Sequence, residues 1–235
     1  MGRDFFAIIT GGGSGTRMGA GIPKQFLEFS EGKCILQASI ERFLEACPDA
    51  TVVTVLPKDH IGYWKLYCLE HNFTVKQLIV EGGFTRFHSV KNALARIPDG
   101  AIVAIHDAVR PFVSPELIRS MRETAEEKGS AIPVLPATDT LKYLDKTAEG
   151  LKECGEKDPD RSRIFGAQTP QVFRSEDIKK AYSQAFDTLF TDDASVAKSK
   201  GIPLTFVEGE RFNIKITTKE DLILSQAILT LLKKR

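Results

Sequence analysis

The sequence predicts an α/β fold, in which helices cover both faces of a mainly parallel sheet. Short apolar runs typical of buried strands alternate along the chain with segments whose apolar residues recur at helical spacing. The 235 residues suit one domain of this kind, and a hydrophobic content of 42% is enough for a sizeable core. We therefore expect residues 1–235 to form a single domain.

We expect strands where apolar and β-branched residues run together, at residues 5–9, 51–56, 75–80, 101–105, 131–135 and 204–207. We expect helices where apolar side chains return every three or four residues, at residues 34–46, 59–71, 89–97, 114–125, 175–185 and 218–231. Ser114, followed by Pro115, and Thr218 are suited to cap two of these helices. Ligands of such sheets bind beyond the carboxyl ends of the strands, so the residues after each strand are candidates for a site.

A glycine-rich stretch follows the first expected strand: Gly11-Gly12-Gly13-Ser14-Gly15-Thr16-Arg17-Met18-Gly19, with Pro23-Lys24-Gln25 close behind. Glycines allow successive backbone N–H groups to point at one anion, and Arg17 and Lys24 add cations suited to phosphate oxygens. The P-loop pattern fails because Lys24 follows proline, and the dinucleotide pattern fails because its third glycine position holds Thr16 or Met18. We interpret the stretch as a polyphosphate site, with a bare turn as the alternative.

The alternation of strands and helices stops between residues 138 and 165. Residues 141–144 and 151–154 are suited to form a hairpin around residues 145–150, and a charged connection follows. This segment has too few apolar residues for a core of its own. It therefore either packs on another surface, for which a second copy of the chain is the simplest candidate, or remains a solvated insertion.

Composition excludes several classes of protein. The net charge of +1 gives no bulk attraction to nucleic acid or to an anionic membrane. No apolar run approaches the ~18 residues of a membrane helix, and the N-terminus lacks a signal-peptide pattern. No C-x-x-C spacing links the four cysteines, which suggests reduced thiols: Cys34, Cys47, Cys68 and Cys154. We expect a cytoplasmic protein that binds neither nucleic acid nor membrane.

Six blocks in order carry a resemblance to a known family: the glycine stretch with Pro23-Lys24-Gln25, His106-Asp107-Ala108-Val109-Arg110-Pro111, Asp139-Thr140-Leu141-Lys142, Gln168-Thr169-Pro170-Gln171, Thr191-Asp192-Asp193-Ala194-Ser195 and Asn213-Ile214-Lys215. Over residues 5–232 the chain resembles the 2-C-methyl-D-erythritol 4-phosphate cytidylyltransferases of the non-mevalonate isoprenoid pathway. The resemblance implies one nucleotidyltransferase domain with a Rossmann-like twisted sheet, and a homodimer joined by a protruding β-arm at about residues 138–165. It also implies transfer of a cytidylyl group from CTP to 2-C-methyl-D-erythritol 4-phosphate, with release of pyrophosphate and a need for Mg²⁺.

The resemblance further implies roles for individual residues. The implied catalytic cations are Arg17 and Lys24, which would stabilise charge at the α-phosphorus, and Arg161 and Lys215, which would orient the sugar phosphate. The implied CTP contacts are Gly11, Gly12, Gly13, Gly15, Gly83, Ser89, Asp107 and Ala108, with Asp107 also near the metal. The implied acceptor contacts are Arg110, Thr140, Thr169 and Thr191. Arg163 is a rival of Arg161, and without the resemblance Asp107 would be taken as a turn cap and Lys215 as a surface charge.

One position departs from the family pattern. An acidic residue often follows the second glycine, where this chain has Phe84. Base preference is in doubt if a carboxylate is needed there, but unaffected if the backbone alone contacts the base. We interpret Phe84 as a packing residue and Arg86 as a brace for this turn.

Two other functions remain open at this point. The ribitol-5-phosphate cytidylyltransferases share the glycine stretch, the His106–Pro111 block and the Gln168–Gln171 block. The Asp139–Lys142 and Thr191–Ser195 blocks favour the methylerythritol enzyme. A nucleotide-binding module without catalysis would not need all the cations that we assign to the phosphates.

Overall fold

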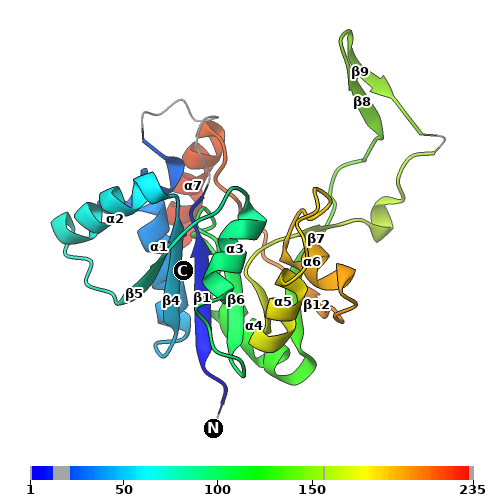
Figure 1. The fold of residues 1–235 in the computed structure, drawn as a ribbon. Coiled ribbons are helices and arrows are strands. Elements are labelled where there is room, and N and C mark those ends of the chain that lie inside the picture. The colour runs from blue at the N-terminus through cyan, green and yellow to red at the C-terminus, as the bar shows by residue number, and fades with distance from the viewer. Residues whose placement is uncertain (1, 13–21, 156, 233–235) are drawn as a thin grey trace.

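The computed structural model describes residues 2–12, 22–155 and 157–232, so the predicted site residues Gly13, Gly15 and Arg17 lie outside the described part of the chain. Eight described strands form the central sheet, in the order β10-β7-β11-β6-β1-β4-β5 with β12 paired to β7 (Figure 1). Their bounds are β1 Phe5–Thr10, β4 Thr51–Leu56, β5 Gln77–Glu81, β6 Ile102–Asp107, β7 Ser130–Pro136, β10 Phe165–Ala167, β11 Gln171–Arg174 and β12 Phe206–Glu208.

The sheet is mainly parallel, as expected. β6, β1, β4 and β5 are parallel neighbours, and β12 runs parallel to β7. The exceptions are β11, which is antiparallel to both β6 and β7, and β10, which is antiparallel to β7. Neither of these short strands was predicted from the sequence, because three or four residues are too few to show a period.

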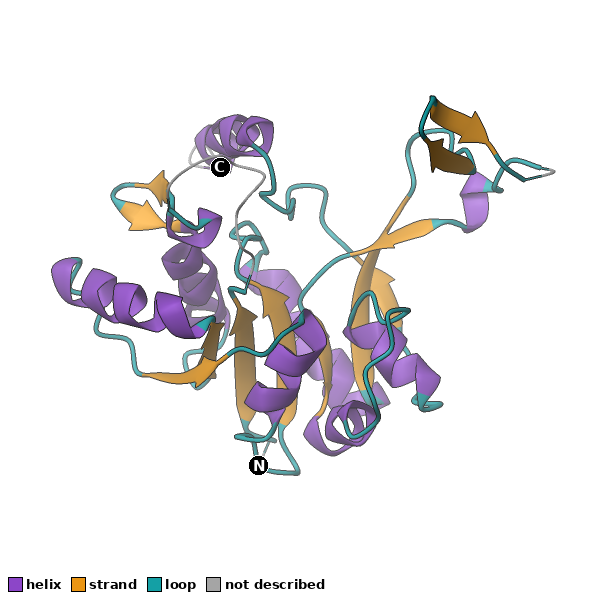
Figure 2. Cartoon of the chain, turned by 45° about the horizontal axis from the view of Figure 1, so that its top comes forward, coloured by secondary structure: helices purple, strands orange, loops and turns teal. Residues whose placement is uncertain are grey.

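Helices cover both faces of the sheet (Figures 1 and 2). Successive residues of β1 enter different cores, since Ala7 and Ile9 pack with α1, α2 and α4, whereas Ile8 packs with α3, α5 and α6. A third cluster joins α7 to the β2–β3 hairpin region and to Val109 and Phe112. The bounds are α1 Ile35–Ala46, α2 Lys58–Glu70, α3 Arg86–Leu94, α4 Pro115–Lys128, α5 Ser175–Tyr182, α6 Asp193–Ser199, α7 Lys219–Leu232, β2 Glu28–Ser30 and β3 Lys33–Cys34.

Side-chain caps explain where several helices begin. Ser114 caps α4 by accepting from the backbone N–H of Leu117, and Thr218 accepts from the N–H of Asp221 at the start of α7, as expected. The helix expected at residues 89–97 instead begins at Arg86, because Thr85 is the capping residue. α6 was not predicted from the sequence; its seven residues begin at an Asp192–Ser195 capping box.

The segment of residues 138–165, hereafter the excursion, contains a hairpin that projects from the body (Figures 1 and 2). Its strands are β8, Leu144–Thr147, and β9, Gly150–Glu153, so the expected strands at 141–144 and 151–154 were misplaced. The turn is tighter than expected, because Gly150 adopts a φ of +126° and Thr147 pairs directly with it. Every residue of β8 and β9 is exposed. Within the described residues, no helix is both long and apolar enough to cross a membrane.

Candidate active site

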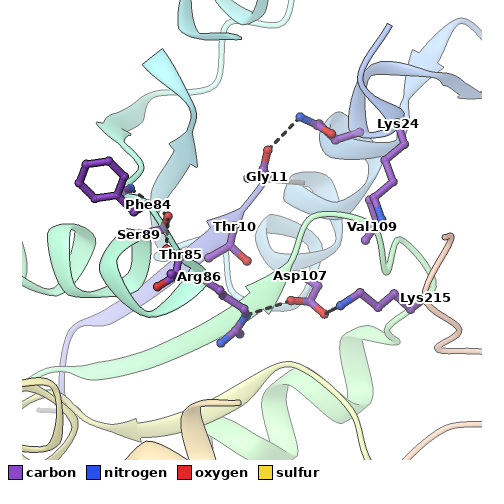
Figure 3. Close-up of a pocket in the computed structure, with 13 residues that line it drawn as sticks. Thr10, Gly11, Lys24, Phe84, Thr85, Arg86, Ser89, Asp107, Val109 and Lys215 are labelled. Carbon is purple, nitrogen blue, oxygen red and sulfur yellow. Dashed lines mark hydrogen bonds and ion pairs between the residues drawn. The ribbon is translucent and has the colours of Figure 1, made fainter. Parts of the chain in front are cut away.

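A pocket of about 300 Å³ opens where β1, β5 and β6 end (Figure 3). This is the position at which parallel sheets bind ligands. The lining comes from the ends of the three strands, the start of α3, the Lys24–Gln25 turn and a late segment of the chain. The lining residues are Thr10, Gly11, Gly12, Lys24, Gln25, Gly83, Phe84, Thr85, Arg86, Ser89, Asp107, Val109 and Lys215.

Asp107, the last residue of β6, is held among three cations. Its carboxylate oxygens lie 2.8 Å from Lys215 Nζ, 3.4 Å from Arg86 Nε and 3.6 Å from Arg110 Nε. Burial alone would raise the pKa of Asp107, but the charges of Arg86, Lys215 and Arg110 outweigh it and hold that pKa well below its usual range. Asp107 is therefore a carboxylate at any pH at which the protein works, at the base of a pocket with a surplus of positive charge.

Arg86 is shared between Asp107 and a second carboxylate. Its two terminal nitrogens donate to Asp193 at 2.8 and 2.7 Å, and Asp193 also accepts from the Tyr182 hydroxyl at 2.6 Å. Asp193 and Tyr182 are buried, whereas the Arg86 side chain is 31% exposed and lines the pocket. From the sequence we expected Arg86 to brace its own turn, whereas in the structure it links β6 to the start of α6.

A buried hydrogen-bonded chain supports Asp107 from below. Burial lowers the pKa of His106 to about 4, so its imidazole is neutral. Its Nε2 lies 3.0 Å from the Arg110 carbonyl, which can only accept, so Nε2 carries the proton and Nδ1 is an acceptor. The Thr169 hydroxyl therefore donates to Nδ1 and accepts from the Asp107 N–H, both at 3.1 Å.

The Gln168–Gln171 segment fixes two further loops around the pocket. Gln168 donates to the carbonyls of Glu210 and Asn213, and Arg110 donates to the same Asn213 carbonyl. These bonds hold the segment that carries Lys215. Gln171 donates to Asp192 and accepts from the Ala194 N–H, which fixes the start of α6. From the sequence, this segment was one of the six blocks, but only Thr169 was given a role, since hydrogen bonds between distant loops leave no local pattern.

Close packing explains two of the predicted glycines. A Cβ at Gly11 would overlap the Leu56 side chain, and a Cβ at Gly83 would overlap the Cβ of His88. The Gly83 N–H donates to Ser89 Oγ at 3.0 Å, and Ser89 in turn donates to the Thr85 carbonyl. Gln25 Nε2 donates to the Gly11 carbonyl at 2.8 Å, which ties the Lys24–Gln25 turn to the end of β1.

The structure brings together seven of the predicted site residues at the pocket: Gly11, Gly12, Lys24, Gly83, Ser89, Asp107 and Lys215. Ala108 and Thr169 are buried beside or beneath it, and Arg110 is partly buried against Asp107. Thr191 is exposed just before α6, and Thr140 and Arg161 are exposed in the excursion, where Arg161 donates to the Thr138 carbonyl. Among the described residues, none of the excursion lines the pocket of its own chain. The hairpin of the excursion projects from the body (Figures 1 and 2).

Phe84 is not a packing residue, so that interpretation was wrong. Its side chain is fully exposed, and its ring points away from the Asp107 carboxylate (Figure 3). Its ring centroid lies 6.5 Å from that of His88, in an edge contact. The tight turn that Gly83 forms against α3 directs the side chain of residue 84 outward.

The Asp107 carboxylate at the pocket fits one kind of metal site. Among the described residues, no three His, Cys, Asp or Glu side chains gather as metal ligands. Of the described residues that line the pocket, only Asp107 offers carboxylate oxygens toward it. Mg²⁺ commonly binds to one or two carboxylates together with substrate phosphates, so this donor set fits Mg²⁺ delivered with a nucleotide and not a cage built by the protein alone.

A profile of the 2-C-methyl-D-erythritol 4-phosphate cytidylyltransferase family matches residues 5–231. The chain belongs to this cytidylyltransferase family. Proteins of that name from Bacteroides thetaiotaomicron and Porphyromonas gingivalis are each 44% identical to it, over 94% and 96% of this chain and 98% and 97% of theirs. The match of whole chains agrees with the resemblance inferred from the six blocks.

Solved cytidylyltransferase structures have the same fold. The enzyme from Francisella tularensis superposes with a TM-score of 0.76 at 29% identity, over 95% of this chain and 99% of that one. The enzyme from Thermus thermophilus gives a TM-score of 0.70 at 28% identity, over 95% of this chain and 98% of that one. The Rossmann-like α/β fold predicted from the sequence is confirmed.

Proposed function

We propose that the chain transfers a cytidylyl group from CTP to 2-C-methyl-D-erythritol 4-phosphate, which gives 4-diphosphocytidyl-2-C-methyl-D-erythritol and pyrophosphate. The observation that carries the proposal is the cationic pocket itself. Lys24 and Lys215 line it from opposite ends of the sequence, and Asp107 lies between Lys215 and Arg86 at its base (Figure 3). Such a site suits two phosphate-bearing substrates that must approach each other despite their negative charges.

The reaction needs charge stabilisation more than a covalent nucleophile. A phosphate oxygen of the acceptor forms a bond to the α-phosphorus of CTP, and the bond from that phosphorus to pyrophosphate breaks. Negative charge gathers on the oxygens around the phosphorus, where fixed cations lower the barrier. We assign Lys24 and Arg17 to this charge, and Lys215 to the acceptor phosphate. Gly83 and Ser89 line the pocket from the turn after β5 and from α3, and we assign the base to them.

Asp107 would hold Mg²⁺ together with the phosphates of CTP. The ion would supply charge neutralisation on the polyphosphate when bound. Arg86 and Arg110 hold the carboxylate in place from the protein side. Lys215 contacts the same carboxylate and can exchange it for the acceptor phosphate.

We also propose a homodimer in which the excursion completes the partner's site. Thr140 and Arg161 lie on the excursion, outside the pocket of their own chain. The excursion also carries exposed apolar side chains that need a partner surface: Tyr143, Leu144, Leu151, Ile164 and Phe165. Thr191 would contact the same acceptor from the body.

Pyrophosphate release tests the function. The enzyme is incubated with Mg²⁺ and either CTP or UTP, and with 2-C-methyl-D-erythritol 4-phosphate or ribitol 5-phosphate. We expect release that requires CTP and the methylerythritol phosphate. Faster release with ribitol 5-phosphate would reassign the acceptor, and CTP binding without release from either acceptor would overturn catalysis.

A further inference from the structure

Arg86 lies between two carboxylates, one at the pocket and one buried behind it. We propose that Asp193, acting through Arg86, positions Asp107 for the reaction, so that Arg86 and Asp193 are positioning residues. The inference rests on the proposed cytidylyl transfer. It adds to the site a residue of α6 that does not line the pocket.

The contacts show which carboxylate determines where Arg86 lies. Arg86 makes a bidentate pair with Asp193 at 2.8 and 2.7 Å, whereas a single donor, Nε, approaches Asp107 at 3.4 Å. Bidentate pairs between arginine and carboxylate are the stronger and geometrically more specific kind. The guanidinium is therefore held by Asp193 and presents its remaining edge to Asp107.

Asp193 is itself rigidly held. It is fully buried, and it belongs to the first turn of α6, which the Asp192–Ser195 capping box and the Gln171–Ala194 hydrogen bond fix in place. The Tyr182 hydroxyl donates to Asp193, and the Tyr182 ring stacks on Phe87 with centroids 4.7 Å apart. Asp107 therefore takes its orientation from the core between α3, α5 and α6.

Charge gives Asp193 a second role. Without Asp193, no other carboxylate would balance the charge of Arg86, and Arg86 would form a closer ion pair with Asp107. With Asp193 behind it, the charge of Arg86 is matched, so Asp107 keeps its attraction for Lys215 on its other side, 2.8 Å away. Removal of Asp193 would add one positive charge to the site and turn Arg86 toward Asp107.

Three variants separate positioning from folding. Arg86→Lys keeps the charge but loses the fork, and Asp193→Asn keeps the shape but loses the charge. Tyr182→Phe keeps both charges and removes one hydrogen bond. We expect the first two to lower kcat by about tenfold or more, with a smaller change in KM for CTP, and Tyr182→Phe to lower kcat by less than about threefold. Arg122→Lys, in an ion pair with Asp49 remote from the pocket, is the control and should match the wild type.

The double variant Arg86→Lys/Asp193→Asn tests whether the pair acts as a unit. We expect its kcat to lie within about threefold of the lower of the two single-variant kcat values, since both changes break the same link between α6 and Asp107. Guanidinium ions added to an Arg86→Ala variant should raise its kcat, because the vacated position opens to the pocket.

Two results would overturn the inference. The first is a lowered melting temperature with unchanged kcat in both Arg86→Lys and Asp193→Asn, which would make the pair purely structural. The second is a double variant whose losses multiply. Wild-type protein without turnover would instead contradict the proposed function. If Asp193→Asn does not fold, Arg86→Lys and the guanidinium rescue carry the test alone.

Discussion

Asp107 is almost buried and yet charged, because three cations approach it. Arg86, Arg110 and Lys215 outnumber the carboxylates of Asp107 and Asp193, which leaves a surplus of one positive charge before Lys24 is added. Arg86 and Lys215 are partly exposed at the pocket, so this surplus positive charge is accessible to an anion that binds there. Each of these cations therefore lowers the free energy of a bound polyphosphate.

The Lys24→Ala variant tests whether the positive charge of Lys24 stabilises the transition state. We expect kcat to fall by about 10²–10³, the usual effect of removing one group that stabilises transition-state charge. The melting temperature should change little, since Lys24 lies in a short turn at the pocket. Lys33→Ala is the matched control, because Lys33 pairs with Glu41 on the surface, and it should keep wild-type kcat. Near-normal turnover of Lys24→Ala would remove Lys24 from the mechanism.

Gly83→Ala should impair CTP binding through the backbone alone. The new Cβ would overlap His88, so the turn that presents Gly83 and Ser89 must shift. We expect KM for CTP to rise by roughly tenfold, equivalent to about 1.4 kcal/mol. Gly62→Ala, in α2 with open space around it, should leave KM unchanged and stabilise the fold by ~0.5–1 kcal/mol. An unchanged KM in Gly83→Ala would place the base elsewhere.

At the scale of elements, the Gln168–Gln171 segment connects three parts of the site, and Gln171, the first residue of β11, shows how. Gln171→Leu keeps the size of the side chain but leaves the Ala194 N–H and Asp192 without their partner. We expect a loss of ~1–3 kcal/mol in the free energy of unfolding, measured by urea denaturation. Gln184→Leu is the comparison. Its hydrogen bonds with Ser199 are exposed and the one to the Val196 carbonyl is only partly buried, so water replaces most of them and the loss should be smaller. Equal losses would contradict the assigned role of Gln171.

The N-terminal segment and α5 are joined by a carboxylate that responds to pH. Burial would raise the pKa of Glu176, but its hydrogen bonds with Arg3 and with backbone N–H groups outweigh this and lower it from 4.5 to about 2. A lowered folded pKa stabilises the fold above pH ~4.5, and this contribution is lost as the pH falls toward about 2.

Glu176→Gln should therefore be less stable than the wild type at pH 7, and the difference should shrink between pH ~4.5 and ~2. Urea denaturation at pH 7, 4.5 and 3 measures it. Glu116→Gln is the control for loss of an exposed ion pair, here with Arg119, and should change the free energy of unfolding little at pH 7. A constant difference at all three pH values would contradict the low pKa of Glu176.

Helices and strands were predicted well from the sequence where a single element is long enough to show its own hydrophobic pattern. The long apolar runs of β1, β4 and β6 and the amphipathic α1 and α4 are such cases. It failed for β11 and α6, which are short and depend on tertiary contacts. In the candidate site, Lys24, Asp107 and Lys215 were predicted because each lies in one of the six sequence blocks that resemble the family. Arg86 and Asp193 lie 107 positions apart, and no local pattern pairs them.

At the scale of the whole molecule, the contacts within one chain do not explain why the excursion adopts its extended conformation. β8 and β9 are exposed in every residue, and the segments on either side expose Tyr143 and Phe165. An isolated two-stranded hairpin is at best marginally stable in water. Contact with a second chain would bury these side chains and bring Arg161 to the partner's pocket.

Mixed dimers test this arrangement directly. Lys24→Ala damages the pocket, whereas Arg161→Ala damages the excursion. If sites are shared, a dimer of one chain of each kind has one intact site, built from the body of the Arg161→Ala chain and the excursion of the Lys24→Ala chain. Random exchange makes about half of the dimers mixed, so about a quarter of wild-type turnover should return.

The matched control is a mixture of Lys24→Ala with Lys215→Ala. Both residues line the pocket of one body, so every site in that mixture stays damaged and no turnover should return. Subunit exchange is measured in parallel with two distinguishable tags. If subunits exchange and the Lys24→Ala and Arg161→Ala mixture stays inactive, each pocket works without the partner's Arg161, and the exposed excursion needs another explanation.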